Sequence, residues 1–447
     1  MESVVESVKI PLEFADKSII IVFIGIICWT GLKNIFAVKT FKFFALGNRN
    51  FSTGALVATI VATYMSGSSF FLILSNVYNK GLYIVLVFFS SYIAIVVLGT
   101  IIVPRMQDFL GNISIAEAID KIYGKWAKYV VSLTIIINSA GAVAVQFKAF
   151  GKIFEYFSTI SPTTSIVFSA LLVTLYSTIG GIKAVVYTDI VQFLAFSFAI
   201  ILIGIIVFHY ADISDKKILQ IVENKRFNLN KIFDTNDLEF WDMMNLSLFF
   251  FIQSLVAPTM LHRILMGSNL ARLRKVMIIS AIVLVFVKIM MVIIPISLFV
   301  INPKLDPEAL IPEIVNKYSP ITGISGMLIL AIIAMSMSTA DSQINTSAVT
   351  FANDIWPSKN PKHKLFAAKF FSLIVGAMGL GIAITNISLL KIITVTAGIY
   401  LSIVIPVLLL TIFGFRTDKS VILTSMGVGF AFIMLFRVYL PETEPSV

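Results

Sequence analysis

Residues 55–77, ALVATIVATYMSGSSFFLILSNV, carry an interruption inside an apolar helix. Helix-forming residues give way at Ala62 to a segment that ends at Ser69, and Gly67 within it is the expected unwinding point. An unwound turn frees backbone carbonyls, which are tolerated at membrane depth only where they line a cavity or coordinate a ligand. The sequence therefore predicts a broken membrane helix with free carbonyl oxygens near its centre.

The composition places this helix in a membrane protein. The chain has 447 residues, of which 58% are hydrophobic and 13% charged, and its mean hydropathy is +0.95. Soluble proteins are typically about 25% charged. The basic residues behind the net charge of +10 are scattered over short loops, so no nucleic-acid-binding module is expected. No phosphate loop or hydrolytic centre is visible, and the sequence predicts neither an enzyme nor an ATP-driven pump.

Apolar runs of about 20 residues, each long enough to cross a bilayer as a helix, recur along the whole chain. We expect an all-α polytopic membrane protein with about twelve transmembrane helices. They are predicted at 18–37, 52–77, 82–104, 126–157, 163–180, 183–210, 240–266, 274–301, 321–355, 365–385, 388–414 and 419–438. Short surface helices are expected at 114–124 and 306–318.

A second interruption fixes the expected topology. Pro258 falls inside the apolar run FFFIQSLVAPTMLHRILMG (249–267) and removes a helix hydrogen bond. The two interrupted helices are the second and the seventh. This spacing indicates two inverted five-helix repeats with a binding site between them. Within a single membrane domain, 1–447, we predict a leading helix at 18–37, repeats at 52–210 and 240–414, and a trailing helix at 419–438.

Lysines and arginines concentrate in alternate loops, which the positive-inside rule places in the cytoplasm. Arg263 is counted among these loop charges, together with Arg272, Arg274 and Lys275. With an even number of helices, both termini are expected outside a bacterial cell membrane.

The segment MSMSTADSQIN (335–345) brings polar residues into another apolar run. Positions three and four apart share one face of a helix. The polar stripe formed in this way contains Met335, Ser338, Thr339, Ser342, Asn345 and Thr346, with Asp341 beside it. Ionisable groups at membrane depth are costly and usually mark ion or substrate paths. Hydroxyl and carboxylate oxygens suit a hard cation, and we expect sodium.

A second carboxylate occurs in YSTIGGIKAVVYTDIVQF (176–193), where a Gly-Gly turn precedes a helix. Asp189 lies about two turns into that helix. This position indicates a place close to the membrane interior. A capping or snorkelling role near the interface is the alternative.

These motifs together resemble the sodium/solute symporter family, which contains bacterial sodium/proline, sodium/pantothenate, sodium/galactose and sodium/sialic acid transporters. The resemblance covers roughly residues 40–415. Its most specific motifs are GGIKAVVYTDIVQ (180–192) and MSTADSQIN (337–345), supported by ALGNRNFS (45–52), ATYMSGSS (62–69) and APTMLHRIL (257–265). It implies a LeuT-type 5+5 inverted repeat with one helix before the core and one after, in a protein that often works as a monomer.

The resemblance also implies where the ions bind. Carbonyls of the broken helix and a carbonyl with two hydroxyls of the ninth span hold sodium in the family, and they map to Ala62, Met65, Met335, Ser338 and Thr339. A further cation site of some members maps to Asp189, Asp341 and Ser342, together with Ser338. One family serine is replaced here by Asp341, which leaves the number and the kind of coupled ions open.

Solute-binding positions follow by analogy of helix and depth. They are Tyr64, Ser68, Ser69, Gln146, Phe250, Gln253 and Ser254. For Gln146 and Gln253, a hydrogen bond between helices is an equally good explanation.

We therefore expect sodium-coupled, secondary active import of a small organic solute, such as an amino acid or pantothenate, with sodium, the solute and the lipid bilayer as partners. Coupling to protons through Asp341 and Asp189, and facilitation without coupling, stay open. A solute-sensing membrane domain is a further alternative. The chain ends at RVYLPETEPSV, soon after the twelfth helix, and we expect no self-contained sensor.

Overall fold

The computed structural model describes residues 12–33, 38–157, 161–211, 224–227, 238–307, 310–318 and 322–439, and these contain helices and connections but no strand. The α-helices are α1 (Phe14–Leu32), α2 (Phe41–Leu46), α3 (Thr53–Tyr64), α4 (Gly67–Lys80), α5 (Leu82–Val97), α6 (Ile115–Tyr123), α7 (Lys125–Phe157), α8 (Pro162–Tyr210), α11 (Leu238–Val256), α12 (Pro258–Leu265), α13 (Leu270–Ile301), α14 (Leu310–Tyr318), α15 (Ile324–Thr350), α16 (Pro361–Ala383), α17 (Leu389–Ile412) and α18 (Lys419–Tyr439). Short 3-10 and π segments are η2 (Gly47–Arg49), η3 (Leu98–Ile102), η4 (Val103–Arg105), η5 (Lys225–Phe227) and η7 (Phe351–Ile355).

The described helices can form the twelve predicted membrane passages. In the described part of the chain, 9 helices are long and apolar enough to cross a bilayer, and the bent pair α3 and α4 makes up to 10. One of them, α8, has 49 residues, or about 73 Å of helix, which exceeds a hydrocarbon core of about 30 Å. It is broken at Gly181, whose φ of 58° and ψ of −168° are not helical, so α8 counts as two passages. The shorter apolar helix α18 adds the last. The division into two inverted repeats stays a prediction.

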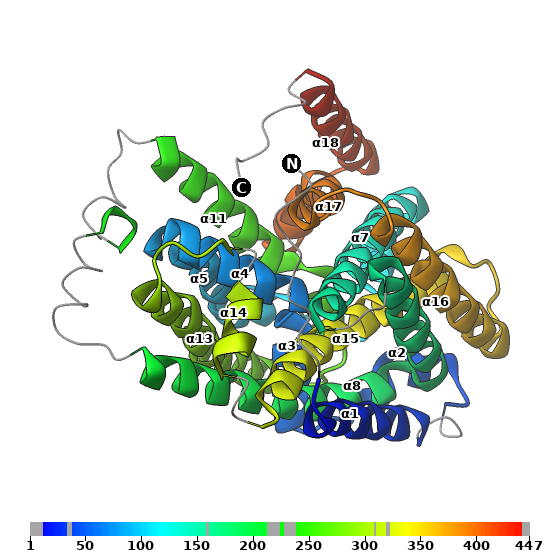
Figure 1. Ribbon diagram of the computed structural model, residues 1–447. Helices are drawn as coiled ribbons and strands as arrows, with labels where there is room; N and C mark the ends of the chain where they lie inside the picture. The colour runs from blue at the N-terminus through cyan, green and yellow to red at the C-terminus, as the bar shows by residue number, and fades with distance from the viewer. Residues whose placement is uncertain are drawn as a thin grey trace.

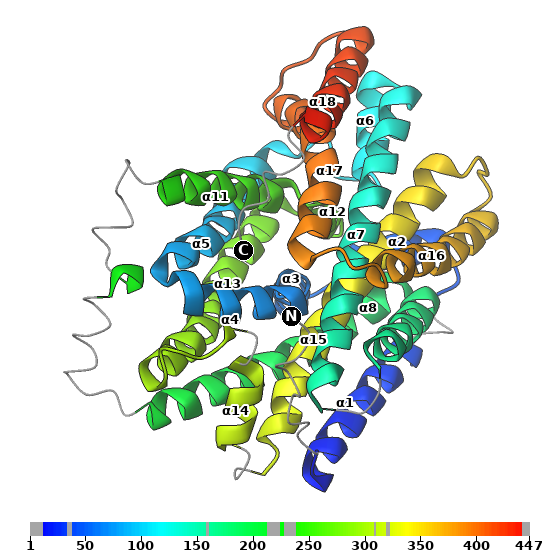
Figure 2. The same ribbon diagram turned by 45° about the horizontal axis from the view of Figure 1, so that its top comes forward.

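α15 forms the centre of the molecule. It packs chiefly on α8 and α7, and also on α1, α16, α3 and α4. Figures 1 and 2 show α15, in yellow, crossing the middle of the bundle beside α3 and α8. The helix is almost wholly buried, although it contains the polar stripe. Its polar side chains therefore face protein and cannot face lipid.

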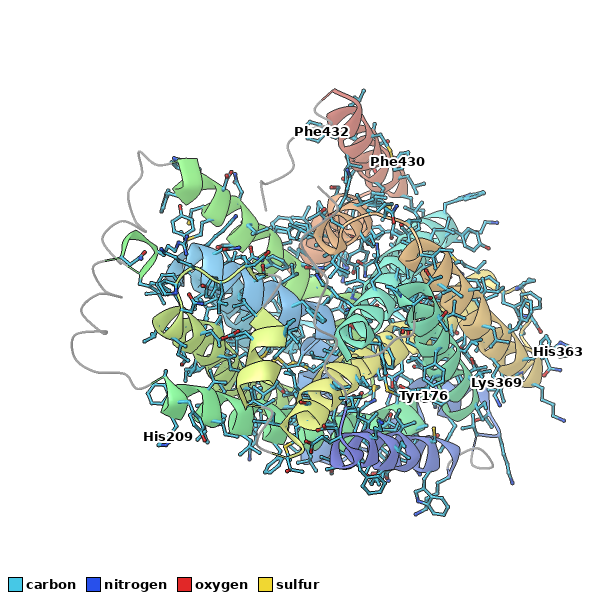
Figure 3. The ribbon with its side chains drawn as sticks, in the orientation of Figure 1. Tyr176, His209, His363, Lys369, Phe430 and Phe432 are labelled. Atoms are coloured by element: carbon cyan, nitrogen blue, oxygen red, sulfur yellow. The ribbon has the colours of Figure 1, made fainter. Side chains whose placement is uncertain are left out.

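Large apolar side chains cover the outside of the bundle. Phe198, Phe366 and Phe432 are 61%, 67% and 67% exposed. Figure 3 shows Phe430 and Phe432 pointing away from the rest of the molecule on α18. Such a surface is stable where lipid tails surround it, which agrees with a multi-pass membrane protein.

Both expected interruptions are present, with one shift in position. α3 ends at Tyr64 and α4 begins at Gly67, with a bend of 56° between them. The extended residues are Met65 and Ser66, so the break lies just before Gly67. Gly67 is required by close packing instead, because an added Cβ would lie 1.9 Å from Oγ of Ser336 on α15. The second break, at Ala257, separates α11 from α12.

The leading helix differs from its predicted bounds. It begins at Phe14 and not at residue 18, because Asp16 closes its first turn by accepting the N–H of Glu13 at 3.1 Å. The other Asp16 oxygen accepts the N–H of Gly326 at 2.7 Å, which ties α1 to the start of α15. The helix ends at Leu32, and the predicted residues 34–37 lie outside the described residues.

A left-handed turn precedes the broken helix. Gly47, Asn48 and Arg49 have φ values of 56°, 60° and 58°. Non-glycine residues rarely adopt this conformation, and each one costs about 1–3 kcal/mol. The turn aims Arg49 at the loop after α5, where its guanidinium donates to the carbonyl of Asn112 at 2.9 Å. The short helix α2 before this turn was not predicted.

Candidate functional site

The break between α3 and α4 faces two hydroxyls of α15. Ser338 Oγ donates to the carbonyl of Ala62 at 2.8 Å. Thr339 Oγ1 lies 3.2 Å from the carbonyl of Thr63 and 3.5 Å from that of Met65. Both hydroxyls also reach the Met335 carbonyl, at 3.0 and 3.1 Å. The structure thus brings together all five residues that were predicted to hold sodium and adds the carbonyl of Thr63.

Local sequence explains why these carbonyls are free. Met65 and Ser66 are extended, with ψ values of 101° and 149°, so the helix ladder ends with the bond from the N–H of Met65 to the carbonyl of Val61. The Ser66 hydroxyl then caps α4 by accepting the N–H of Ser69 at 3.1 Å. The carbonyls at the end of α3 have no helix partner, and they turn toward α15.

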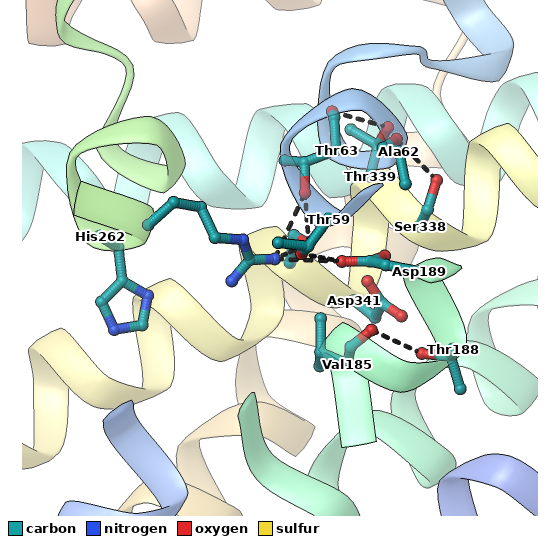
Figure 4. Close-up of polar contacts among 12 residues, drawn as sticks. Thr59, Ala62, Thr63, Val185, Thr188, Asp189, His262, Ser338, Thr339 and Asp341 are labelled. Atoms are coloured by element: carbon teal, nitrogen blue, oxygen red, sulfur yellow. Dashed lines mark hydrogen bonds and ion pairs between the residues drawn. The ribbon is translucent and has the colours of Figure 1, made fainter. Parts of the chain in front are cut away.

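The predicted second cation group gathers around a guanidinium. Arg263, on α12, is 1% exposed. It donates to Ser342 Oγ at 2.6 Å and forms an ion pair with Asp189 at 3.3 Å. Asp189 also accepts the hydroxyl of Thr59, and Tyr176 donates to Asp341 at 2.7 Å. Figure 4 shows Asp189 and Asp341 side by side, next to the contact between Ala62 and Ser338.

This arrangement corrects one prediction and supports another. Arg263 was counted as a loop charge, and the structure places it in the protein interior because two carboxylates and two hydroxyls of neighbouring helices surround its guanidinium. Asp189 is fully buried and paired with Arg263, which argues against a snorkelling role, and its place near the membrane interior stays a prediction. With both carboxylates ionised, the group carries one net negative charge. The Oδ1 atoms of Asp189 and Asp341 have no hydrogen-bond partner among the described residues.

A cavity of about 190 Å³ opens beside the broken helix. It is lined by residues of α3, α4, α5, α7, α11, α12, α13, α15 and α17. All seven residues that were predicted to bind solute line it, namely Tyr64, Ser68, Ser69, Gln146, Phe250, Gln253 and Ser254. Gln146 also donates to Ser68 at 3.1 Å, so this residue makes the alternative inter-helix hydrogen bond as well. Their contact with a solute stays a prediction.

The cavity contains groups that the sequence reading missed. Tyr92 on α5, Lys288 on α13 and Tyr400 on α17 all line it. Lys288 carried a signal in the sequence, because it is a charged residue in the middle of the predicted span 274–301. The aromatic residues carried none, since apolar membrane helices are rich in them.

The cavity and the sodium-binding candidates share a wall. Thr63 and Thr339 line the cavity, and both also belong to the contact between α3 and α15. A solute in the cavity would therefore touch residues of the predicted sodium site. This is a physical route by which one ligand can change the affinity for the other.

Comparisons with known proteins identify the family. A model of the sodium:solute symporter family matches residues 44–429. The sodium/sialic acid symporter NanT of Aliivibrio fischeri is 24% identical over 345 residues, which cover 72% of this chain and 66% of the relative. The sodium/pantothenate symporter of Haemophilus influenzae is 24% identical over 346 residues, which cover 74% and 71%. The chain thus spans about two thirds of the length of NanT.

A solved structure agrees in fold. The substrate-bound, outward-open structure of a Na⁺-coupled sialic acid symporter matches with a TM-score of 0.78 at 20% identity, covering 95% of this chain and 98% of that one. The likeness confirms the predicted LeuT-type fold. With the family model matching most of its length, the chain belongs to the sodium:solute symporter family, whose coupling ion is sodium.

Proposed function

We propose that this protein imports a small organic solute together with sodium by alternating access. The observation that carries the proposal is the meeting of free carbonyls of Ala62, Thr63 and Met65 with the hydroxyls of Ser338 and Thr339. All these ligands are neutral oxygens. Calcium sites use several carboxylates, whereas unwound backbone carbonyls hold sodium in transporters of this architecture.

The ion would act as a bridge between two moving parts. Sodium entering from outside joins the end of α3 to α15, stabilises the outward-open state and orders the cavity beside Tyr64. Solute binding then favours closure, and loss of the bridge on the inward side releases both. Coupling requires only that sodium bind the solute-competent state more tightly. The membrane potential adds about 2.3 kcal/mol per charge per 100 mV.

The experiment is a thermal-stability screen of the purified protein in detergent, run in sodium and in potassium. Amino acids, betaines, pantothenate, sugars and sialic acid form the panel. We expect one solute class to raise the melting temperature in sodium only. The variant Ser338→Ala/Thr339→Ala should lose this sodium dependence, because it removes both hydroxyls of the bridge.

Ser347→Ala is the matched control. Ser347 lies on the same helix and is fully buried, and its hydroxyl makes no hydrogen bond to the described residues. It should keep the sodium response of the wild type. Stabilisation that is equal in potassium, or that survives the double substitution, would refute the assignment of the sodium site.

A second candidate is proton coupling through Asp189 and Asp341. The charge balance favours it, because two carboxylates face one guanidinium and leave a negative charge that a proton can neutralise. Uptake into proteoliposomes distinguishes sodium coupling from proton coupling. Sodium coupling predicts uptake driven by a sodium gradient at equal pH on both sides, and proton coupling predicts uptake driven by a pH gradient without sodium.

The remaining expectations belong to the same proposal. We place the protein in a bacterial cell membrane as a monomer with both termini outside. The curated bacterial relatives and the exposed apolar surface support the membrane location.

A further inference from the structure

Lys288 lies in the cavity as a charge for which the described residues provide no counter-ion. Its side chain is buried, with 3% exposure, and it is the one charged residue among the described residues that line the cavity. Its ammonium lies 5.6 Å from the ring centre of Phe88 and 6.0 Å from that of Tyr92. No hydrogen bond or ion pair joins it to any residue that the structure describes.

A lysine at this place needs a reason. An ionised side chain at the centre of a membrane helix costs about 2.5–3.5 kcal/mol on insertion scales, and such residues usually pair with one another or face a substrate path. Snorkelling does not explain Lys288. Roughly 20 Å of helix separate it from the nearer end of α13 at Ile301, farther than a lysine stem reaches. Two ring faces attract the ammonium weakly and leave its three donors unused.

We propose that Lys288 is the anchor for the carboxylate of the transported solute, and that this solute is a small organic acid. The proposal rests on the symport function proposed above and names its substrate class. The missing counter-ion is then supplied by the solute. A carboxylate beside Lys288 gains a charge-assisted hydrogen bond in a cavity whose described lining residues include no competing acid.

The other residues of the cavity indicate the size and chemistry of the remainder of this acid. At about 190 Å³ the cavity is small for a ligand pocket, which favours a compact solute. Tyr64, Phe250 and Tyr400 offer ring surfaces to an apolar body. Ser91, Asn138 and Gln253 can bond to hydroxyl or carbonyl groups on it.

An aromatic-lined cavity is also the usual site for a quaternary ammonium ligand. Here Lys288 already occupies the faces of Phe88 and Tyr92. A second cation would meet a like charge that no described carboxylate of the cavity offsets. The arrangement therefore favours an anion over choline-like solutes.

The first test compares acids with their own amides, which have nearly the same shape without the charge. Pyruvate, lactate and benzoate are paired with pyruvamide, lactamide and benzamide, and choline is added. Affinity is measured from the melting temperature in sodium and in potassium. We expect at least one acid to bind tenfold or more tightly than its amide. Lys288→Met should abolish this preference, and Lys288→Arg should retain part of it.

Lys275→Met is the control, because Lys275 lies on the same helix, is exposed and does not line the cavity. It should bind like the wild type. Tighter binding of the amides or choline, or an acid preference that survives Lys288→Met, overturns the anchor. Acid binding that is equal in potassium leaves the anchor standing and refutes sodium coupling. Sodium-dependent binding of a neutral solute supports sodium coupling and refutes the anchor.

The second test needs no knowledge of the solute. Ala142, a half-buried residue that lines the cavity, is replaced by cysteine in a chain carrying Cys28→Ser. Its rates of reaction with an anionic and a cationic methanethiosulfonate are compared. We expect the anion-to-cation rate ratio to fall at least tenfold in Lys288→Met and to stay unchanged in Lys275→Met. An unchanged ratio in Lys288→Met contradicts a charge-selective cavity.

Discussion

Arg263 makes the interior of this protein depend on charge balance. Its guanidinium is shared by Asp189, Ser342 and Thr63, which come from three different helices. Removing one partner of a buried ion pair lowers stability far more than replacing both partners by apolar residues, because an uncompensated charge remains.

We expect Arg263→Met to destabilise the protein by about 3–5 kcal/mol, since it leaves Asp189 buried without its cation. Asp189→Asn in the same chain should restore much of the stability. The melting temperature in detergent measures both. Arg105→Met is the control, because Arg105 is exposed, and its contacts are a hydrogen bond to the carbonyl of Ile101 and the ring of Phe413, 5.2 Å from its guanidinium. A melting temperature equal to that of the wild type in Arg263→Met would contradict the ion pair.

At the level of residues, the sequence predicted the positions of short side chains on regular helices better than those of long side chains. Ser338 and Thr339 have short side chains on a regular helix, and the structure has them opposite the broken helix, where periodicity and the family resemblance placed them. Arg263 was missed for the opposite reason. It fell inside the predicted span 240–266, yet it was read as a loop charge. A charge within a predicted span was the available signal.

Among the elements, the broken helix depends on how closely α4 approaches α15. An added Cβ at Gly67 would lie 1.9 Å from Ser336 Oγ and 3.0 Å from the carbonyl of Ile332. The first contact can be relieved by turning a side chain, but the second involves backbone. Any larger residue therefore moves α4 away from α15 and shifts the adjacent carbonyl of Met65.

Gly67→Ala should lower the free energy of unfolding by about 1–3 kcal/mol through overpacking. Its effect on the affinity for sodium should be larger than its effect on the melting temperature in the absence of sodium. The sodium concentration that gives half-maximal stabilisation is the measurement. Gly54→Ala, where nothing lies within 4 Å of the added Cβ, should match the wild type. Unchanged sodium affinity in Gly67→Ala would show that the approach of α4 to α15 does not set the ion site.

The elements themselves were predictable because lipid imposes helix length. Each long apolar run became a helix, and both breaks appeared beside the glycine and the proline that indicated them. The features that the sequence did not predict depend on tertiary contacts. The tie between α1 and the start of α15 is the contact of Asp16 with Gly326, and the left-handed turn at Gly47–Arg49 is held by Asn112 from a distant loop. No local pattern records such partners.

For the molecule as a whole, polar contacts join several of the basic loops at the predicted inner end. Arg272 donates to Thr53 and to the carbonyl of Phe51, and Arg416 pairs with Asp108 at 2.9 Å. These contacts connect the starts of α3 and α13 and the loops after α5 and α17. The basic residues thus serve as ties between helices as well as markers of orientation.

The orientation can be tested with single cysteines in the Cys28→Ser chain. Asn386→Cys, between α16 and α17, should react with a membrane-impermeant maleimide on intact cells. Lys359→Cys, between η7 and α16, should react only after the membrane is opened, because the two sites lie at opposite ends of α16 and both are exposed. The reverse pattern would place both termini inside.

The turn at Gly181 affects how the chain is made. The two halves of α8 follow each other without a soluble loop, and an added Cβ at Gly181 would lie 3.1 Å from the backbone of Phe44. During synthesis, one half of α8 cannot stay in water while the other half inserts. The two halves should therefore enter the bilayer together, as one hairpin. Gly181→Ala, which strains the turn, is then expected to reduce the amount of protein inserted while the inserted fraction still responds to sodium.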